Sequence, residues 1–176
     1  AVVTEVLDAV NETKKWYLVL EELPTDLVDV YFYPEWVMLH RFNPGSRALM
    51  FTFQKQGKIW AYPFLLSPIS FSDQSSFEKK WHDIETAYGY GGPVANTKDK
   101  DFLVEAHNAF ISWCHRQNVV AEFVRLHPLI QNEQWIDSDV KITFDRETVY
   151  LNFALLKNDE LPFTSKTRNM LNRAEN

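Results

Sequence analysis

The residues of this chain best suited to bind a ligand lie at positions 83–93, in the sequence DIETAYGYGGP. Closely spaced glycines, among them Gly91 and Gly92, allow positive φ angles and let backbone N–H groups approach a ligand. Tyr88 and Tyr90 add ring faces and hydroxyl groups to the same turn. The segment has neither the GK(S/T) ending of a phosphate loop nor the GxGxxG spacing of a dinucleotide site. It fits either a ligand-binding loop or a tight turn whose tyrosines pack on the core.

Arg125 is a second candidate, because it stands in the apolar run of residues 119–126, which predicts a buried central strand covered on both faces. An unpaired guanidinium in such a strand would be costly, so Arg125 must meet an anion. The anion is either an internal carboxylate, such as Glu122 or Asp83, or a substrate carboxylate or phosphate held bidentately. Strand alternation puts Glu122 and Arg125 on opposite faces, which disfavours that pairing. Asp83 and Glu85 could also act as paired acids, although acids before a glycine loop are usually solvated or capping.

Metal and nucleophile chemistry find little support in the sequence. His107 and Cys114 share one predicted helix face, but two helical turns separate them, which is too far for one ion. The other histidines show no ligand-like spacing, and no GxSxG elbow occurs. Cys114, inside an apolar helix, is interpreted as a small core residue. We therefore expect neither a metal nor a cofactor in this chain.

Composition and charge indicate a single globular domain. The chain has 176 residues and 20.7 kDa, is 45% hydrophobic and 24% charged, and its 15% aromatic content suits both a core and a pocket for an organic substrate. A net charge of -6 disfavours nucleic acid as the main ligand of this chain. The single cysteine fits a reducing compartment, and no stretch is long and apolar enough to span a bilayer. These features predict a cytoplasmic protein.

Hydrophobic periodicity predicts interleaved helices and strands, and hence an α/β (α+β) fold of mixed layers. The expected strands are residues 2–7, a hairpin over 49–66, the strand 119–126 and a second hairpin over 140–153. The expected helices are residues 11–23, 34–42, 98–117 and a last helix from position 165 that carries Lys166, Arg168 and Arg173. The basic residues of the last helix suggest that it docks on something outside this sequence.

The order of these segments resembles that of FemAB-like proteins, a branch of the GNAT N-acetyltransferase superfamily that includes the peptidoglycan interpeptide-bridge aminoacyltransferases. The resemblance rests mainly on YGYGGP at residues 88–93 and FVRLHP at residues 123–128. Supporting matches extend it over almost the whole chain, at residues 16–24, 29–36, 148–151 and 165–174.

The resemblance implies a GNAT-like central twisted, mainly antiparallel mixed sheet flanked by helices, with residues 1–160 forming one domain. It implies that this domain is the first half of a tandem protein, and that residues 161–176 form a helix leading toward a second GNAT-like domain. Such proteins transfer an acyl or aminoacyl group to an amine. This half would bind the acceptor, a cell-wall or surface-polysaccharide precursor, in a cleft between the domains.

Carried over residue by residue, the resemblance implies that Tyr88, Tyr90 and Arg125 face the acceptor, together with Asp83. The superfamily's pyrophosphate loop, (Q/R)xxGx(G/A) ahead of a helix, is absent from this sequence. The donor, acyl-CoA or aminoacyl-tRNA, is therefore expected to bind the second domain, and this chain alone is expected to be inactive. Two alternatives are a non-catalytic binding or interaction module with a degenerate acyltransferase fold, and a complete small acyl-CoA acetyltransferase, against which the absent loop counts.

Overall fold

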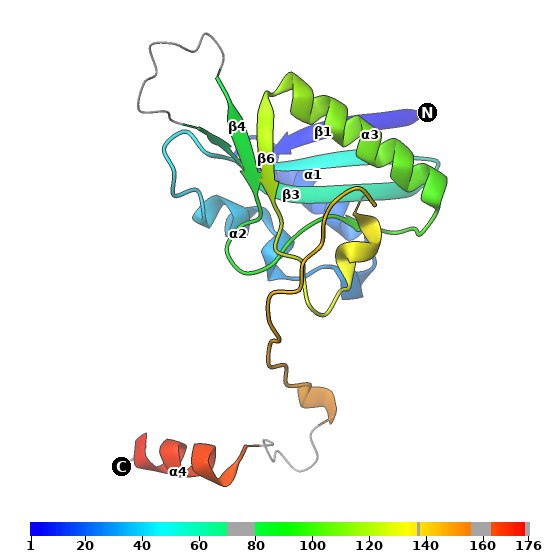
Figure 1. Cartoon of the computed structure of the whole chain (residues 1–176). Helices are drawn as coiled ribbons and strands as arrows, with labels where there is room; N and C mark the ends of the chain where they lie inside the picture. The colour runs from blue at the N-terminus through cyan, green and yellow to red at the C-terminus, as the bar shows by residue number, and fades with distance from the viewer. Residues whose placement is uncertain (70–79, 137, 156–162, 175–176) are drawn as a thin grey trace. The chain divides into compact units, whose positions relative to one another are not determined.

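The computed structural model describes residues 1–69, 80–136, 138–155 and 163–174 (Figure 1). The chain divides into two compact units, Ala1–Thr143 and Phe144–Asn176. The first unit holds the sheet and the hydrophobic core, and the second holds the helix α4 (Ser165–Ala174). Every residue predicted to form the site belongs to the first unit.

A mixed sheet of six strands forms the middle of the first unit, within the described residues. The strand order is β1-β2-β3-β4-β6, and the short β5 pairs with β3. All pairs are antiparallel except β4 with β6, which are parallel. The strands are β1 (Val2–Asp8), β2 (Arg47–Lys55), β3 (Lys58–Pro68), β4 (His82–Glu85), β5 (Val94–Ala95) and β6 (Val119–Phe123). The predicted mixed α/β class is confirmed, and β6 is an edge strand.

The described part of the first unit also contains the α-helices α1 (Thr13–Glu21), α2 (Pro34–Leu39) and α3 (Lys100–Arg116). Pro34 begins α2 at a position where a missing N–H costs nothing. Asp99 caps α3, since its carboxylate accepts hydrogen bonds from the backbone N–H groups of Asp101 and Phe102. The predicted helices are thus confirmed within a few residues, although α2 ends at Leu39 rather than at position 42.

Alternating side chains of β3 face different helices. Tyr62 and Phe64 contact Phe110 of α3, with ring centroids 5.3 and 5.9 Å apart. The next residue along the strand, Leu65, lies on the opposite side, near His40 at the end of α2. Helix α3 therefore covers one face of the sheet, and α2 lies at the other (Figure 1).

The hairpin predicted over residues 49–66 is confirmed as β2 and β3. Lys55 pairs with Lys58 across a two-residue turn, in which Gln56 and Gly57 have φ angles of 53° and 75°. Two positive φ angles give the turn a twist that matches that of the flanking strands. The hairpin places alternate aromatic side chains on the α3 face and so supplies much of the core.

The prediction of a buried central strand over residues 119–126 is wrong. Strand β6 ends at Phe123, and Val120 and Phe123 are 55% and 62% exposed. The sheet order explains this result, because β6 has β4 on one side and no strand on the other among the described residues. An apolar run predicts a strand, but it does not tell whether that strand lies in the centre or at the edge of a sheet.

The second predicted hairpin, over residues 140–153, is also wrong. Residues 141–152 form neither helix nor strand, and Val149 is 93% exposed. A two-stranded hairpin is marginal in water unless a further strand or a helix covers it.

None of the helices in the described part of the chain is long and apolar enough to cross a membrane.

Candidate functional site

A cavity of about 210 Å³ opens where the parallel strands β4 and β6 end, and we refer to it as the strand-end cavity. Glu85 and Phe123 are the last residues of these two strands, pair in register and both line the cavity. Loops that follow parallel strands converge at one edge of a sheet, where ligands commonly bind. Tyr88 and Arg125, two of the residues predicted from the sequence, line the same cavity.

Tyr88 is held by its backbone and offers its side chain to solvent. Its carbonyl oxygen accepts a hydrogen bond of 3.0 Å from Nε1 of Trp36, in α2. Its ring stacks on that of His40 with centroids 6.0 Å apart, and the residue is 72% exposed. The ring and hydroxyl are therefore available at the mouth of the strand-end cavity.

Arg125 combines a fixed backbone with an open guanidinium. Its N–H donates to Oγ1 of Thr86 over 3.1 Å, and its carbonyl oxygen accepts from the N–H of Gly91 over 2.8 Å. The guanidinium forms no hydrogen bond or ion pair with any residue that the structure describes, and Arg125 is exposed. The prediction that this guanidinium is buried in a strand is wrong, because β6 ends two residues earlier.

Tyr90 does not line the strand-end cavity. Its ring packs edge-on against those of Tyr31 and His127, with centroids 5.4 and 5.6 Å away. His127 is itself buried: its Nε2 lies 3.0 Å from Oδ2 of Asp29, and its Nδ1 accepts from the N–H of Leu129. Because Nδ1 accepts, Nε2 carries the proton and donates to Asp29. This cluster packs the loop of residues 88–93, which contains Tyr90, and the segment that contains His127 against residues 29–32.

Gly91 and Gly92 are required by packing within the protein. A Cβ atom on Gly91 would lie 2.9 Å from Cγ2 of Thr86, and one on Gly92 would lie 2.8 Å from Nδ2 of Asn132. Gly92 also has a φ angle of 95°, which favours glycine. The N–H of Gly91 is already donated to Arg125, so it is not available to a ligand.

Asn132 links the loop of residues 88–93 to the segment that contains His127, and the sequence did not point to it. It is fully buried, and its Nδ2 donates to the carbonyl oxygens of Gly91 and Pro93 over 2.7 and 3.2 Å. Its Oδ1 accepts from the N–H of His127 over 2.9 Å. An asparagine in a polar segment carries no periodic signal, so only the contacts identify this residue.

Asp83 lies in the middle of β4, opposite Ala121 of β6, and is not among the residues that line the strand-end cavity. Glu85, two residues later, does line it. The structure thus brings together Tyr88, Arg125 and Glu85, and it leaves Asp83 and Tyr90 outside the cavity wall. Among the described residues, no group of three or more His, Cys, Asp or Glu side chains could hold a metal ion.

Comparison of the chain with protein-family models, with curated proteins and with solved structures gave no match.

Proposed function

We propose that this chain is the acceptor-binding half of a FemAB-like N-acyltransferase or aminoacyltransferase, which acts on an amine of a cell-wall or surface-polysaccharide precursor. The motifs YGYGGP and FVRLHP support the proposal. So does the mainly antiparallel mixed sheet with helices beside it, since the resemblance implies a sheet of this kind. The observation that carries the proposal is the open guanidinium of Arg125 beside Tyr88 at a cavity of about 210 Å³.

The chemistry of these groups suits an anionic acceptor. A guanidinium grips a carboxylate or phosphate through two parallel N–H bonds and so sets its orientation. The ring of Tyr88 offers a face to a sugar or to an apolar side chain of the acceptor. Glu85 lines the same cavity and would repel a second anion, so it favours a ligand whose acidic group lies on the Arg125 side. This half would thus position the acceptor amine for attack on an activated carbonyl.

The donor has no place in this half, since the pyrophosphate loop is absent from the sequence. Acyl-CoA or aminoacyl-tRNA is proposed to bind a second GNAT-like domain of the same protein. Stabilisation of the oxyanion that forms during transfer is assigned to that domain as well.

Calorimetric titration with a soluble uridine diphosphate-linked muramoyl peptide tests the proposal. We expect Arg125→Ala to weaken binding by roughly tenfold to a hundredfold, because a charge-assisted hydrogen bond is worth about 1.5–3 kcal/mol. Arg125→Lys should bind with intermediate affinity, since it keeps the charge and loses the planar fork. The thermal midpoint should hardly change, because the guanidinium has no bonded partner among the described residues.

Arg116→Ala is the matched control, since this exposed arginine ends α3, outside the residues that line the strand-end cavity. An equal loss of affinity in both variants would reduce the effect to net charge and contradict the proposal. Precursor binding without acyl transfer by a protein that contains a second domain would favour the alternative of a non-catalytic binding module.

A further inference from the structure

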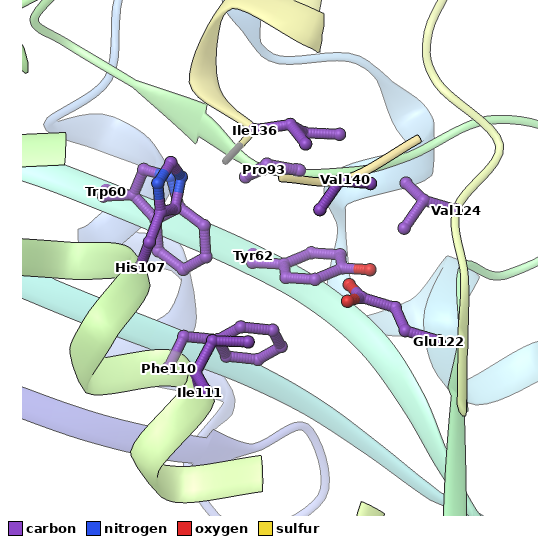
Figure 2. A pocket seen from close by; sticks show the side chains of 10 residues that line it. All are labelled: Trp60, Tyr62, Pro93, His107, Phe110, Ile111, Glu122, Val124, Ile136 and Val140. Carbon is purple, nitrogen blue, oxygen red and sulfur yellow. The ribbon is translucent and has the colours of Figure 1, made fainter. Parts of the chain in front are cut away.

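A second cavity lies on the other face of the sheet, beneath α3, and we refer to it as the α3 cavity (Figure 2). Glu122 lines it, whereas the next residue of β6, Phe123, lines the strand-end cavity. Successive residues of a strand point to opposite faces, so the two cavities are separated by the sheet. The α3 cavity has a volume of about 40 Å³, which gives room for roughly three water-sized groups.

Tyr62 presents an unpaired hydroxyl to the α3 cavity. The residue is 1% exposed, and its Oη forms no hydrogen bond of ordinary length and angle among the described residues. Burial, and then the negative charge of Glu122, raise the pKa of Tyr62 well above its usual value, so the hydroxyl keeps its proton. A buried hydroxyl without a partner is costly, and such groups are uncommon in native proteins.

Glu122 points its carboxyl group at this hydroxyl (Figure 2). Glu122 is exposed as a residue because β6 is an edge strand, but the carboxyl itself faces inward. Burial raises the pKa of Glu122, and the Tyr62 hydroxyl, which lies near the carboxyl group without a hydrogen bond of ordinary geometry, lowers it in part. No cation forms an ion pair with Glu122 in the described part of the chain.

The remaining walls of the α3 cavity are mainly apolar and aromatic. The rings of Trp60 and Phe110 line it, and both residues are almost fully buried. The carbonyl oxygen of Trp135 accepts from Nε1 of Trp60 over 3.0 Å and is bonded to Nε2 of His107 over 2.7 Å. These two nitrogens are therefore occupied, and among the described residues that line the cavity the side-chain oxygens belong to Tyr62 and Glu122.

We propose that the α3 cavity binds a primary ammonium group, whose N–H bonds are accepted by the carboxylate of Glu122 and by Oη of Tyr62. A cation would compensate the negative charge of Glu122, which has no ion-pair partner among the described residues, and the aromatic ring faces would attract the cation further. An anion would be repelled, and a neutral alcohol would satisfy the hydrogen bonds but leave the charge uncompensated. The size of the cavity admits an ammonium group on a short alkyl stem.

A larger amine can enter with its ammonium group first. Ile111 of α3 and Val140 line the cavity and remain 45% and 42% exposed, so they mark the side that opens to solvent. The stem of the ligand would leave between these two side chains. The site is independent of Arg125 and of the proposed acyl transfer, because it lies across the sheet from the strand-end cavity.

Ethylammonium is the probe for the test, titrated into the intact chain at constant ionic strength and followed by amide chemical shifts. Saturable binding with a millimolar dissociation constant is expected, in keeping with the small size of the probe. The shifts should centre on Phe110, Glu122 and Val124. Ethanol and acetate, which have similar sizes, should bind at least about tenfold more weakly.

Two substitutions at the site and one elsewhere separate the proposal from a general attraction of cations to an acidic protein. Glu122→Gln keeps the shape and removes the charge, and it should weaken ethylammonium binding by about tenfold or more. Tyr62→Phe keeps the ring and should weaken binding a few-fold while thermal stability is retained or rises, because an unpaired hydroxyl is removed. Glu133→Gln, at an exposed position outside the residues that line the cavity, should bind as the parent chain does.

The proposal is overturned if ethylammonium shows no saturable binding, or if Glu122→Gln and Glu133→Gln reduce binding equally. It is also overturned if ethanol binds as well as ethylammonium, since the α3 cavity would then be a neutral polar pocket.

Discussion

The charge of Glu122 affects the thiol of Cys114, a residue of α3. Burial, and then the charge of Glu122, raise the pKa of the Cys114 thiol from 9.0 to about 12. The native protein therefore holds this proton more tightly than the unfolded chain does. Through this group, the free energy of unfolding falls as the pH rises from about 9 toward 12, and it is unaffected at lower pH.

We expect iodoacetamide to alkylate Cys114 in the native chain roughly a thousandfold more slowly than an ordinary thiol at pH 8, because the thiolate is the reactive form. The rate should recover in denaturant, which serves as the internal control. Glu122→Gln should raise the native rate, since it removes one of the two effects that raise the pKa of the thiol. Rapid alkylation of the native protein would show that the thiol is neither buried nor close to an acid.

At the scale of elements, the loop of residues 88–93 is shaped by close contacts with its neighbours. Gly92 is enclosed by Asn132, Leu126 and Val124, whereas Gly57, in the β2–β3 turn, would meet no atom within 4 Å of an added Cβ. Both glycines have positive φ angles, of 95° and 75°. They therefore differ in crowding more than in backbone conformation.

Gly57→Ala should cost about 1–2 kcal/mol of unfolding free energy, from the positive φ angle alone. Gly92→Ala should cost about 1–3 kcal/mol more, because the added methyl group must displace packed side chains. Urea denaturation of both variants measures the difference. Equal losses would show that the loop can yield around Gly92.

Asn132 is the polar link between this loop and the segment that contains His127. Asn132→Ala would leave the two carbonyl oxygens and the N–H that it now pairs without partners in a buried place. Each unsatisfied group costs about 1–3 kcal/mol, so this substitution should be among the most destabilising in the chain, as urea denaturation would measure. Asn96→Ala is a suitable comparison, because that side chain also pairs with backbone groups, the N–H of Ile59 in β3 and the carbonyl oxygen of Gly57 in the β2–β3 turn, but its bonds are less buried. If Asn132→Ala is no more destabilising than Asn96→Ala, then water replaces the lost bonds.

Local patterns predicted the elements that local forces determine. The β2–β3 hairpin follows from alternation around Gln56 and Gly57, and α3 follows from a long apolar stripe that begins after Asp99. The pattern of β6 was equally clear, yet its exposure was misjudged, because the neighbours of a strand depend on the path of the whole chain. The hairpin expected over residues 140–153 failed for a related reason, since pairing requires a partner that the pattern does not specify.

The candidate site was predictable in part. Tyr88 and Arg125 were separate candidates by residue type, the resemblance assigned them to one site, and both line the strand-end cavity. It was not predictable that Tyr88 lines the cavity while Tyr90 packs against Tyr31 and His127, since the two tyrosines are only two positions apart. Nor did the sequence reveal Tyr62 and Glu122, because their meeting depends on the register between β3, β4 and β6.

At the scale of the whole molecule, the boundary between the two units falls in a segment without regular structure. Phe144 and Tyr150 are 78% and 56% exposed, and no strand or helix holds residues 141–152. Chymotrypsin should therefore cut early at these two residues, since proteases prefer exposed, irregular chain. Mass spectrometry of a brief digest identifies the sites. Protection of both residues while Phe110 or Phe64 is cleaved would show that the segment packs firmly.

The hydrogen bond between Trp36 and the carbonyl oxygen of Tyr88 has an optical consequence. Trp36 is partly exposed, and its indole N–H ends on the backbone of a residue that lines the strand-end cavity. A ligand that shifts Tyr88 should also change the polarity around this indole. The intrinsic fluorescence of Trp36 should therefore respond when a ligand binds in the strand-end cavity, without an attached dye.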